Sequence, residues 1–341
     1  MERTWKRSVG LALVAALVLA SLSVLPTAAA PTRVRQAGFK VVDLAVPFLA
    51  QARGAFARHG LAWEYVEIDS GKLGVSALLS GNVQFVDLAL DDVVALQREG
   101  RDPILVYSMV NALTMDLVVR NDVLARLGVT PRSPLEARVK ALRGLTFGIT
   151  RPGAVTQLFP QYLLRKAGYD PEKDATFVQV GPGQALVAAM KSRRIDAFML
   201  SAPAPYLLER DGVGTVLIKN SAGDGPPEFA DFAFESIAVL RGWAERHPAV
   251  VTGYIRALNE TYTWMVANRG AALRALRPFF PDTDEATLRL SFEALIPPIK
   301  PGGRLSERAI RNQAQVLVAI GALDAMPATR EGVLWTNRYH R

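Results

Sequence analysis

The chain has no cysteine among its 341 residues. This absence excludes a disulfide framework, and it leaves no thiolate to act as a nucleophile or as a zinc ligand. It also excludes a lipid-anchored cysteine at an export processing site.

Histidine is nearly as scarce, with three in the whole chain, at His59, His247 and His340. No two of them have the spacing of a helical zinc motif, so we expect no metal site. His59 and His247 lie at predicted helix ends, and His340 is expected in a tail. Ser201 follows a predicted strand but lacks a G-x-S-x-G elbow, so we expect no catalytic residues and no hydrolase.

Glycine patterns that bind phosphate are missing too. The glycines of the second half do not form a Walker A loop or a G-x-G-x-x-G turn, so neither a nucleotide nor any other cofactor is indicated. They stand at Gly148, Gly153, Gly181 and Gly183.

A long apolar run occurs once, at residues 9–24, and it is short for a membrane span. Three basic residues precede the run, and the small residues of Pro26–Ala30 follow it. This order is typical of a signal peptide, which we assign to residues 1–29 with cleavage after Ala29. We therefore expect a soluble exported protein, in the periplasm of a diderm bacterium.

Basic residues exceed acidic ones, with a formal net charge of +8. Removing residues 1–29 takes away three basic residues and one acidic residue, which leaves +6. The remaining bases are scattered among acids, as in Arg256–Glu260, and do not form the stripe of a nucleic-acid surface. We expect no nucleic-acid partner.

What the chain does contain is a weak duplication at an offset of about 110 residues, the size of one α/β lobe. The first copy begins at Val34–Phe39 and the second at Leu145–Thr150. Each reads strand, helix, strand, helix, strand, which is typical of βαβ units and a mostly parallel sheet. Two such copies predict two lobes with a ligand cleft between them.

Short runs rich in Val, Ile and Phe mark the strands. We expect them at residues 34–39, 63–68, 83–90, 104–107, 115–120, 146–150, 176–180, 195–200, 215–219 and 232–240. Helices are expected at 155–167, 183–192 and 203–210, in a helical region after Pro248, and from Leu305 to about Ile320.

The fold class that follows is α/β, with two doubly wound, mostly parallel sheets joined by a two-stranded hinge near residues 112–120 and 228–238. Lobe I then comprises residues 30–114 and 233–341, and lobe II comprises residues 115–232.

Candidate binding residues follow from the rule that ligands bind beyond the carboxyl ends of parallel strands, where helix N-termini offer free N–H groups. In the second copy these residues are Thr150, Arg151, Gly153, Ala154, Val155, Thr156, Ser201 and Pro203. Gly153 permits close backbone approach. The hydroxyl of Thr156 either meets the ligand or caps the following helix.

The matching positions of the first copy are Phe39, Lys40, Gly71, Leu90, Asp91 and Asn111. Phe39 either stacks on an aromatic ligand or belongs to the core. Asp91 and its neighbour Asp92 precede a helix and are more typical of N-caps than of ligand contacts. The first copy is thus acidic at its strand ends, whereas the second carries hydroxyl groups.

These residues also carry a family likeness. Residues 148–156, 162–174 and 188–197, together with Arg58–Leu61 and His247–Pro248, resemble the sulfonate, taurine, nitrate and pyrimidine-precursor group of ABC-transporter substrate-binding proteins, the NMT1-like superfamily. The resemblance covers nearly all of the chain after residue 29. It implies a periplasmic type II binding-protein fold that closes at a hinge around a small molecule, works as a monomer and delivers the solute to the transmembrane subunits of an ABC permease.

Two departures from the family pattern bear on the ligand. Ala154 stands where sulfonate and nitrate binders often have a hydroxyl donor, and Asp43, Asp91 and Asp92 lie near the expected cleft. A carboxylate facing a sulfonate is costly unless it is protonated or paired, and Lys40 or Arg151 can supply the pairing charge. A sulfonate-like anion, an aromatic acid and a pyrimidine all remain open.

Two rival functions use the same fold. The superfamily includes a fungal thiamine-pyrimidine synthase, but that group is associated with a cysteine-rich motif, which this chain lacks. A ligand-binding adaptor of a membrane sensor needs the same cleft as a transport receptor, so the sequence does not separate these two functions.

Overall fold

The computed structural model describes residues 30–68, 71–297 and 302–340. The predicted signal peptide and its cleavage after Ala29 lie outside the described residues. Within these described residues, no helix is long and apolar enough to cross a membrane.

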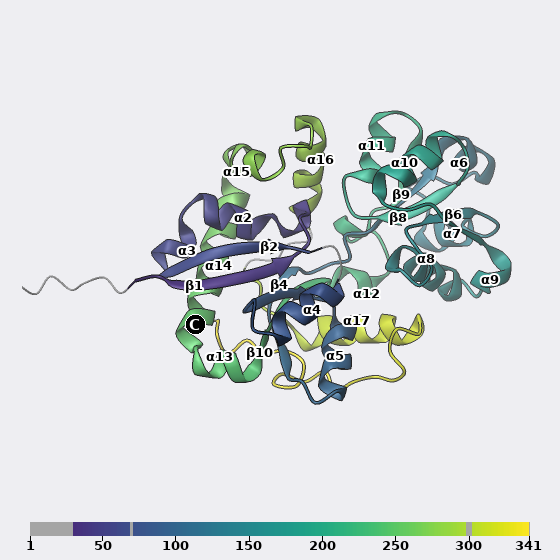
Figure 1. The fold of residues 1–341 in the computed structure, drawn as a ribbon. Helices are drawn as coiled ribbons and strands as arrows, with labels where there is room; N and C mark the ends of the chain where they lie inside the picture. Colours follow the sequence, from purple (N-terminus) through teal and green to yellow (C-terminus); the bar gives the residue numbers. More distant parts are fainter. Residues whose placement is uncertain (1–29, 69–70, 298–301, 341) are drawn as a thin grey trace, which may run out of the picture.

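The strands form two separate five-stranded sheets (Figure 1). The first sheet has the order β2-β1-β3-β10-β4 and contains β1 (Thr32–Gly38), β2 (Leu61–Glu67), β3 (Phe85–Leu88), β4 (Pro103–Val110) and β10 (Glu235–Leu240). The second has the order β7-β6-β8-β5-β9 and contains β5 (Asp116–Arg120), β6 (Thr146–Ile149), β7 (Thr176–Gln179), β8 (Ala197–Leu200) and β9 (Gly214–Ile218).

The two sheets are topological copies of each other. In the first, β10 runs antiparallel to its neighbours β3 and β4, while β1 is parallel to β2 and β3. In the second, β5 runs antiparallel to β8 and β9, while β6 is parallel to β7 and β8. This confirms the predicted class, two mostly parallel α/β sheets. It also makes the end of β1 equivalent to that of β6, and the end of β3 equivalent to that of β8.

Helices surround both sheets (Figure 1). The first lobe, meaning the first sheet with its helices, contains η1 (Val42–Leu44), α2 (Ala45–Ala52), α3 (Ala55–Arg58), α4 (Gly71–Leu79), α5 (Leu90–Arg98), α13 (Arg241–Arg246), α14 (Pro248–Ala267), α15 (Arg269–Leu276), η3 (Arg277–Phe279), α16 (Glu285–Leu295) and α17 (Glu307–Ala319). The second lobe contains α6 (Asn121–Leu127), α7 (Leu135–Lys140), α8 (Val155–Lys166), α9 (Pro171–Asp174), α10 (Gly183–Lys191) and α11 (Ala204–Arg210).

Two connections join the lobes. The first, residues 111–115, leads from β4 to β5, and the second, residues 219–234, leads from β9 to β10 and holds η2 (Asn220–Ala222) and α12 (Pro227–Ala230). The strand predicted at 232–240 begins later, at Glu235, and the one predicted at 83–90 ends at Leu88. Phe232 and Leu90 are nevertheless buried, because apolar side chains belong to the core whichever element carries them.

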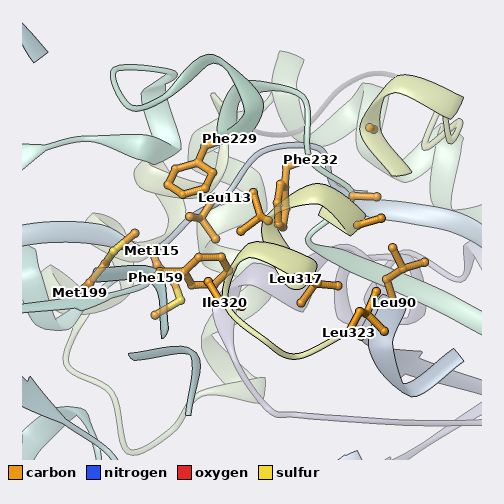
Figure 2. Packing of buried hydrophobic residues seen from close by; sticks show 14 of the residues in the cluster. Leu90, Leu113, Met115, Phe159, Met199, Phe229, Phe232, Leu317, Ile320 and Leu323 are labelled. Carbon is orange, nitrogen blue, oxygen red and sulfur yellow. The ribbon is translucent and has the colours of Figure 1, made fainter. Parts of the chain in front are cut away.

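One continuous apolar cluster runs through both lobes at these connections. Figure 2 shows side chains from it: Phe159 and Met199 of the second lobe, Leu113 and Met115 of the first connection, Phe229 and Phe232 of the second connection, and Leu90, Leu317, Ile320 and Leu323 of the first lobe. Helix α17 packs against α12 in this cluster. A second contact joins Tyr206 and Val216 of the second lobe to Ala294 of α16.

Candidate functional site

Three polar side chains link the lobes at the ends of their strands. Oγ1 of Thr114, in the first connection, donates to Oδ2 of Asp43 at 2.8 Å. The same hydroxyl lies 2.8 Å from Oγ of Ser201, which follows β8 in the second lobe. Asp43 belongs to η1, just after β1. Thr114 therefore bridges the two places where the sequence predicts binding residues.

Asp43 is held in an unusual electrostatic setting. Its side chain is buried, and burial raises the pKa of its carboxyl to about 6 in spite of the hydrogen bonds from Thr114 and Ser201. The nearby carboxylate of Asp116 raises it further. The carboxyl of Asp43 therefore holds its proton to a higher pH than an exposed aspartate does.

Asp116, at the start of β5, is a structural neighbour of this bridge. Its carboxylate accepts hydrogen bonds from the Tyr206 hydroxyl and from N and Oγ of Ser221, the latter two at 2.9 and 2.8 Å. Burial raises the pKa of Asp116 above its usual value, because it outweighs the opposite effect of these donors and of the charge of Lys219. These contacts fix the first turn of the second connection against β5.

The loop after β6 is held by hydrogen bonds between two of its own threonines, Thr150 and Thr156. Oγ1 of Thr156 accepts from N of Thr150 at 3.0 Å and lies 2.9 Å from the Thr150 hydroxyl. Gly153 has φ +74°, a conformation that favours glycine, and its N–H donates to Oε1 of Gln157 at 2.8 Å. The N-cap of α8 is Ala154 without a side-chain cap. The alternative in which Thr156 caps this helix is therefore wrong, because its hydroxyl is turned back to Thr150.

The remaining residues of this loop are more open. Arg151 is exposed, and within the described residues it makes no ion pair. Val155, the first residue of α8, is 42% exposed. Pro203, the predicted first residue of α11, is the N-cap of that helix, which begins at Ala204.

At the end of β1, a tyrosine fixes the backbone. The Tyr65 hydroxyl donates to the carbonyl oxygen of Phe39 at 2.7 Å. The Phe39 ring is half-buried and packs against the core of the first lobe, as one of its two predicted alternatives required. Lys40 is exposed and lies 3.9 Å from the Glu67 carboxylate, so within the described part of the chain its charge is paired away from Asp43.

Four further candidates of the first lobe have different settings. Gly71 begins α4. Leu90 is 1% exposed, so its side chain belongs to the core. Asp91 lies in the first turn of α5, whose N-cap is Ala89, so neither it nor Asp92 is the expected N-cap. Asn111 is buried, and its Nδ2 donates to Oγ of Ser108 at 3.0 Å.

Sequence reasoning missed Thr114, Asp87 and Glu235. Asp87 lies in the middle of β3 and is 3% exposed, and Glu235 begins β10. The carboxyl groups of Asp87 and Glu235 are within hydrogen-bonding distance of each other. A charged residue inside the apolar run Phe85–Leu88 was the available signal, since such residues are rarely buried without a purpose.

The three histidines have structural partners. His59 ends α3 and lies 3.3 Å from the Glu260 carboxylate, and His247 is the N-cap of α14. The prediction that His340 lies in a tail is wrong. Its ring stacks on Tyr107 and lies 2.8 Å from the carbonyl oxygen of Val106. Among the residues that were searched, no group of three or more His, Asp or Glu side chains could hold a metal ion.

Comparison with known proteins adds a family and a fold. Residues 27–276 match the model of the NMT1-like family. The nitrate/nitrite binding protein NrtA of Nostoc sp. is 23% identical over 247 residues, which is 68% of this chain and 54% of that protein. The putative binding protein YtlA of Bacillus subtilis is 22% identical over 250 residues, covering 72% of this chain and 70% of that protein.

Solved structures resemble the chain over almost its full length. The periplasmic aliphatic sulphonate binding protein SsuA from Escherichia coli has a TM-score of 0.67 at 18% identity, covering 91% of this chain and all of that one. The periplasmic nitrate-binding protein NrtA from Synechocystis has a TM-score of 0.60 at 17% identity, covering 88% and 84% of the two chains. The two-lobed fold is therefore shared with both proteins.

Proposed function

The chain belongs to the NMT1-like family, and from this premise we propose that it is a periplasmic solute receptor that delivers a small organic molecule to an ABC permease. Nitrate- and sulphonate-binding relatives support this role. Because the chain spans about half the length of the NrtA protein that it matches, solute and partner are inferred here from the site and not from that relative.

The observation that carries the proposal is the position of Thr114. Its hydroxyl lies 2.8 Å from Asp43 of one lobe and 2.8 Å from Ser201 of the other. A solute that binds at these strand ends would contact both lobes and the connection between them. Such a solute stabilises the closed arrangement by its higher affinity for that arrangement.

The moving units are proposed to be residues 30–114 with 233–341 and residues 115–232. The solute site is proposed to comprise the strand-end residues predicted from the sequence together with Asp43 and Thr114. In this arrangement the backbone at Gly153–Val155 and the exposed side chain of Val155 approach the solute from the second lobe. Leu90 contributes through its backbone, because its side chain is in the core.

A binding role is favoured over catalysis by the state of the reactive side chains. The chain has no cysteine, its three histidines have structural partners, and Lys40 lies beside Glu67. We propose that the protein acts without a cofactor and as a monomer, exported after cleavage near Ala29.

The test combines solute identification with measurement of closure. The protein is expressed with residues 1–29 and recovered from the periplasm, and any co-purified solute is identified by native mass spectrometry. A thermal-shift screen of sulfonates, aromatic carboxylates, pyrimidines and organic amines follows, with small-angle scattering on each hit. We expect a bound solute to raise the unfolding midpoint and lower the radius of gyration. If no compound changes either quantity, the receptor role is wrong.

A further inference from the structure

Buried carboxyl groups converge where the two lobes meet. Asp43 and Asp87 are 6% and 3% exposed, and Glu235, at the start of β10, is partly buried. Asp87 and Glu235 lie close enough to share a hydrogen bond. The negative charge of Asp43 raises the pKa of both. We call Asp43, Asp87 and Glu235 the junction carboxyls. Through Thr114 they reach Ser201 of the second lobe.

One carboxyl of this group, that of Asp87, has few donors. It is hydrogen-bonded to the Glu235 carboxyl and to the backbone of Ser236, and among the described residues other than these two its buried Oδ1 has no hydrogen-bond partner. Two carboxyl groups can be neighbours only if one of them holds a proton. Burial and the charge of Asp87 raise the pKa of Glu235 well above its usual value, so Glu235 carries that proton. Asp87 then carries the negative charge of the pair, and a buried charge is costly unless an opposite charge lies beside it.

No described cation compensates these groups. Lys40 lies beside Glu67, and Lys219 lies over the Tyr206 ring and acts on Asp116. The other titratable groups that face the junction carboxyls are Tyr65, Tyr254, Asp92 and Asp116, all neutral or acidic. Buried carboxylates are matched by a positively charged group that donates hydrogen bonds, and a protonated organic nitrogen is such a group.

Apolar side chains are exposed around the same strand ends. Val41, Leu73 and Val155 are 43%, 53% and 42% exposed, and they follow β1, begin α4 and begin α8 respectively. They make up three of the five large apolar side chains that are exposed in the described residues. Exposed apolar residues on both lobes suit a solute with a hydrocarbon or aromatic body.

We propose that the solute is an organic cation whose protonated nitrogen donates to the junction carboxyls, with Asp87 as its main acceptor. This proposal rests on the proposed receptor function and names its solute class. An amine, amidine or guanidine fits, because each carries a positive charge and several N–H donors. Nitrate and sulfonates do not fit, because they add negative charge to an uncompensated acidic site.

Proton linkage distinguishes the two kinds of solute. Calorimetric titrations with benzamidinium, 1,4-diaminobutane, nitrate and methanesulfonate are run at pH 5, 6 and 7 in two buffers of different ionisation enthalpy. A cation that binds ionised carboxyls displaces their protons, so its affinity rises by up to about tenfold per pH unit. An anion requires protonated carboxyls, so it takes up protons and loses affinity as pH rises. We expect proton release with at least one cation.

Matched variants locate the acceptor. Asp87→Asn keeps the shape of the side chain and is expected to weaken cation binding about tenfold to hundredfold and to reduce proton release. Asp324→Asn, at an exposed site on the first lobe, is the control and should change neither. If Asp87→Asn fails to fold by circular dichroism, Asp87→Ser, which also removes the carboxylate, replaces it with the same expectations.

The outcomes separate this proposal from the receptor role. Binding of nitrate or methanesulfonate with proton uptake overturns the cation, and so does a neutral or anionic solute found in the purified protein. Unchanged cation affinity in a folded Asp87 variant also overturns it. In each of these cases closure by the bound solute leaves the receptor role standing. If no compound of the full screen binds, the receptor role and the cation are both wrong.

Discussion

The hydroxyl of Tyr65 donates to the carbonyl oxygen of Phe39 at 2.7 Å, and Gly38 lies next to this hydroxyl. A Cβ atom at Gly38 would lie 2.9 Å from the Tyr65 oxygen. The end of β1 is therefore held by an interaction that has no room for a side chain at position 38.

Gly38→Ala should lower the free energy of unfolding by about 1 to 2 kcal/mol, because the tyrosine hydroxyl must move and leave the Phe39 carbonyl unpaired. Denaturant unfolding of a double-mutant cycle with Tyr65→Phe checks the cause. When the hydroxyl is removed first, Gly38→Ala should cost distinctly less. If Gly38→Ala lowers the free energy of unfolding equally with Tyr65 and with Phe at position 65, the contact between position 38 and the tyrosine hydroxyl is not the cause.

The threonine pair in the β6–α8 loop is also testable. Thr156→Val removes the acceptor for N of Thr150 and should destabilise the protein by about 1 to 3 kcal/mol. Thr156→Ser keeps the hydroxyl and should recover most of that loss. If the serine variant is as unstable as the valine variant, the methyl group and not the hydrogen bond matters at this position.

The buried acids predict an unusual dependence of stability on pH. Burial raises the pKa of Asp43, Asp87 and Asp92 to about 6. Between pH 4 and 6 the folded protein therefore binds more protons at these sites than the unfolded chain, so the free energy of unfolding falls as pH rises through this window. Asp43, the group whose substitution is tested below, should contribute about 1 kcal/mol of this fall between pH 5 and 7.5.

Thermal unfolding of the solute-free protein at these two pH values measures this effect. Asp43→Asn cannot ionise, so its unfolding midpoint should fall less than that of the unchanged protein. Asp324→Asn, an exposed substitution, should follow the unchanged protein. A midpoint that rises from pH 5 to 7.5 in the unchanged protein would contradict the raised pKa values.

The aromatic residues of the second connection should be critical for stability. Phe229 and Phe232 are 0% and 1% exposed, and truncating either to Ala should cost about 3 to 5 kcal/mol. Val266→Ala, at a side chain that is 36% exposed, should cost less than about 1 kcal/mol. Guanidinium unfolding with a single transition tests this. A loss under about 1 kcal/mol at both phenylalanines would mean that the connection is not part of the core.

The sequence predicted the fold better than the site. Strand and helix positions were within a few residues because apolar periodicity is a local signal, and the duplication predicted that β1 matches β6 and β3 matches β8. The role of Thr114 was not foreseeable, because its partners Asp43 and Ser201 are brought to it by the pairing of distant strands. Asp87 was hidden for a different reason: its apolar neighbours in β3 led us to treat it as part of an ordinary strand.

The apolar cluster shared by Phe159, Phe229 and Leu317 has a consequence for how the duplicated chain can be divided. Each lobe has a buried cluster of its own, but the cluster that contains these three residues is divided between the two copies. A fragment of residues 115–232 would contain Phe159 and Phe229 but not α17, which packs against the same cluster. It would expose these apolar side chains and tend to aggregate. The duplication of the backbone therefore does not mark two parts that would fold separately.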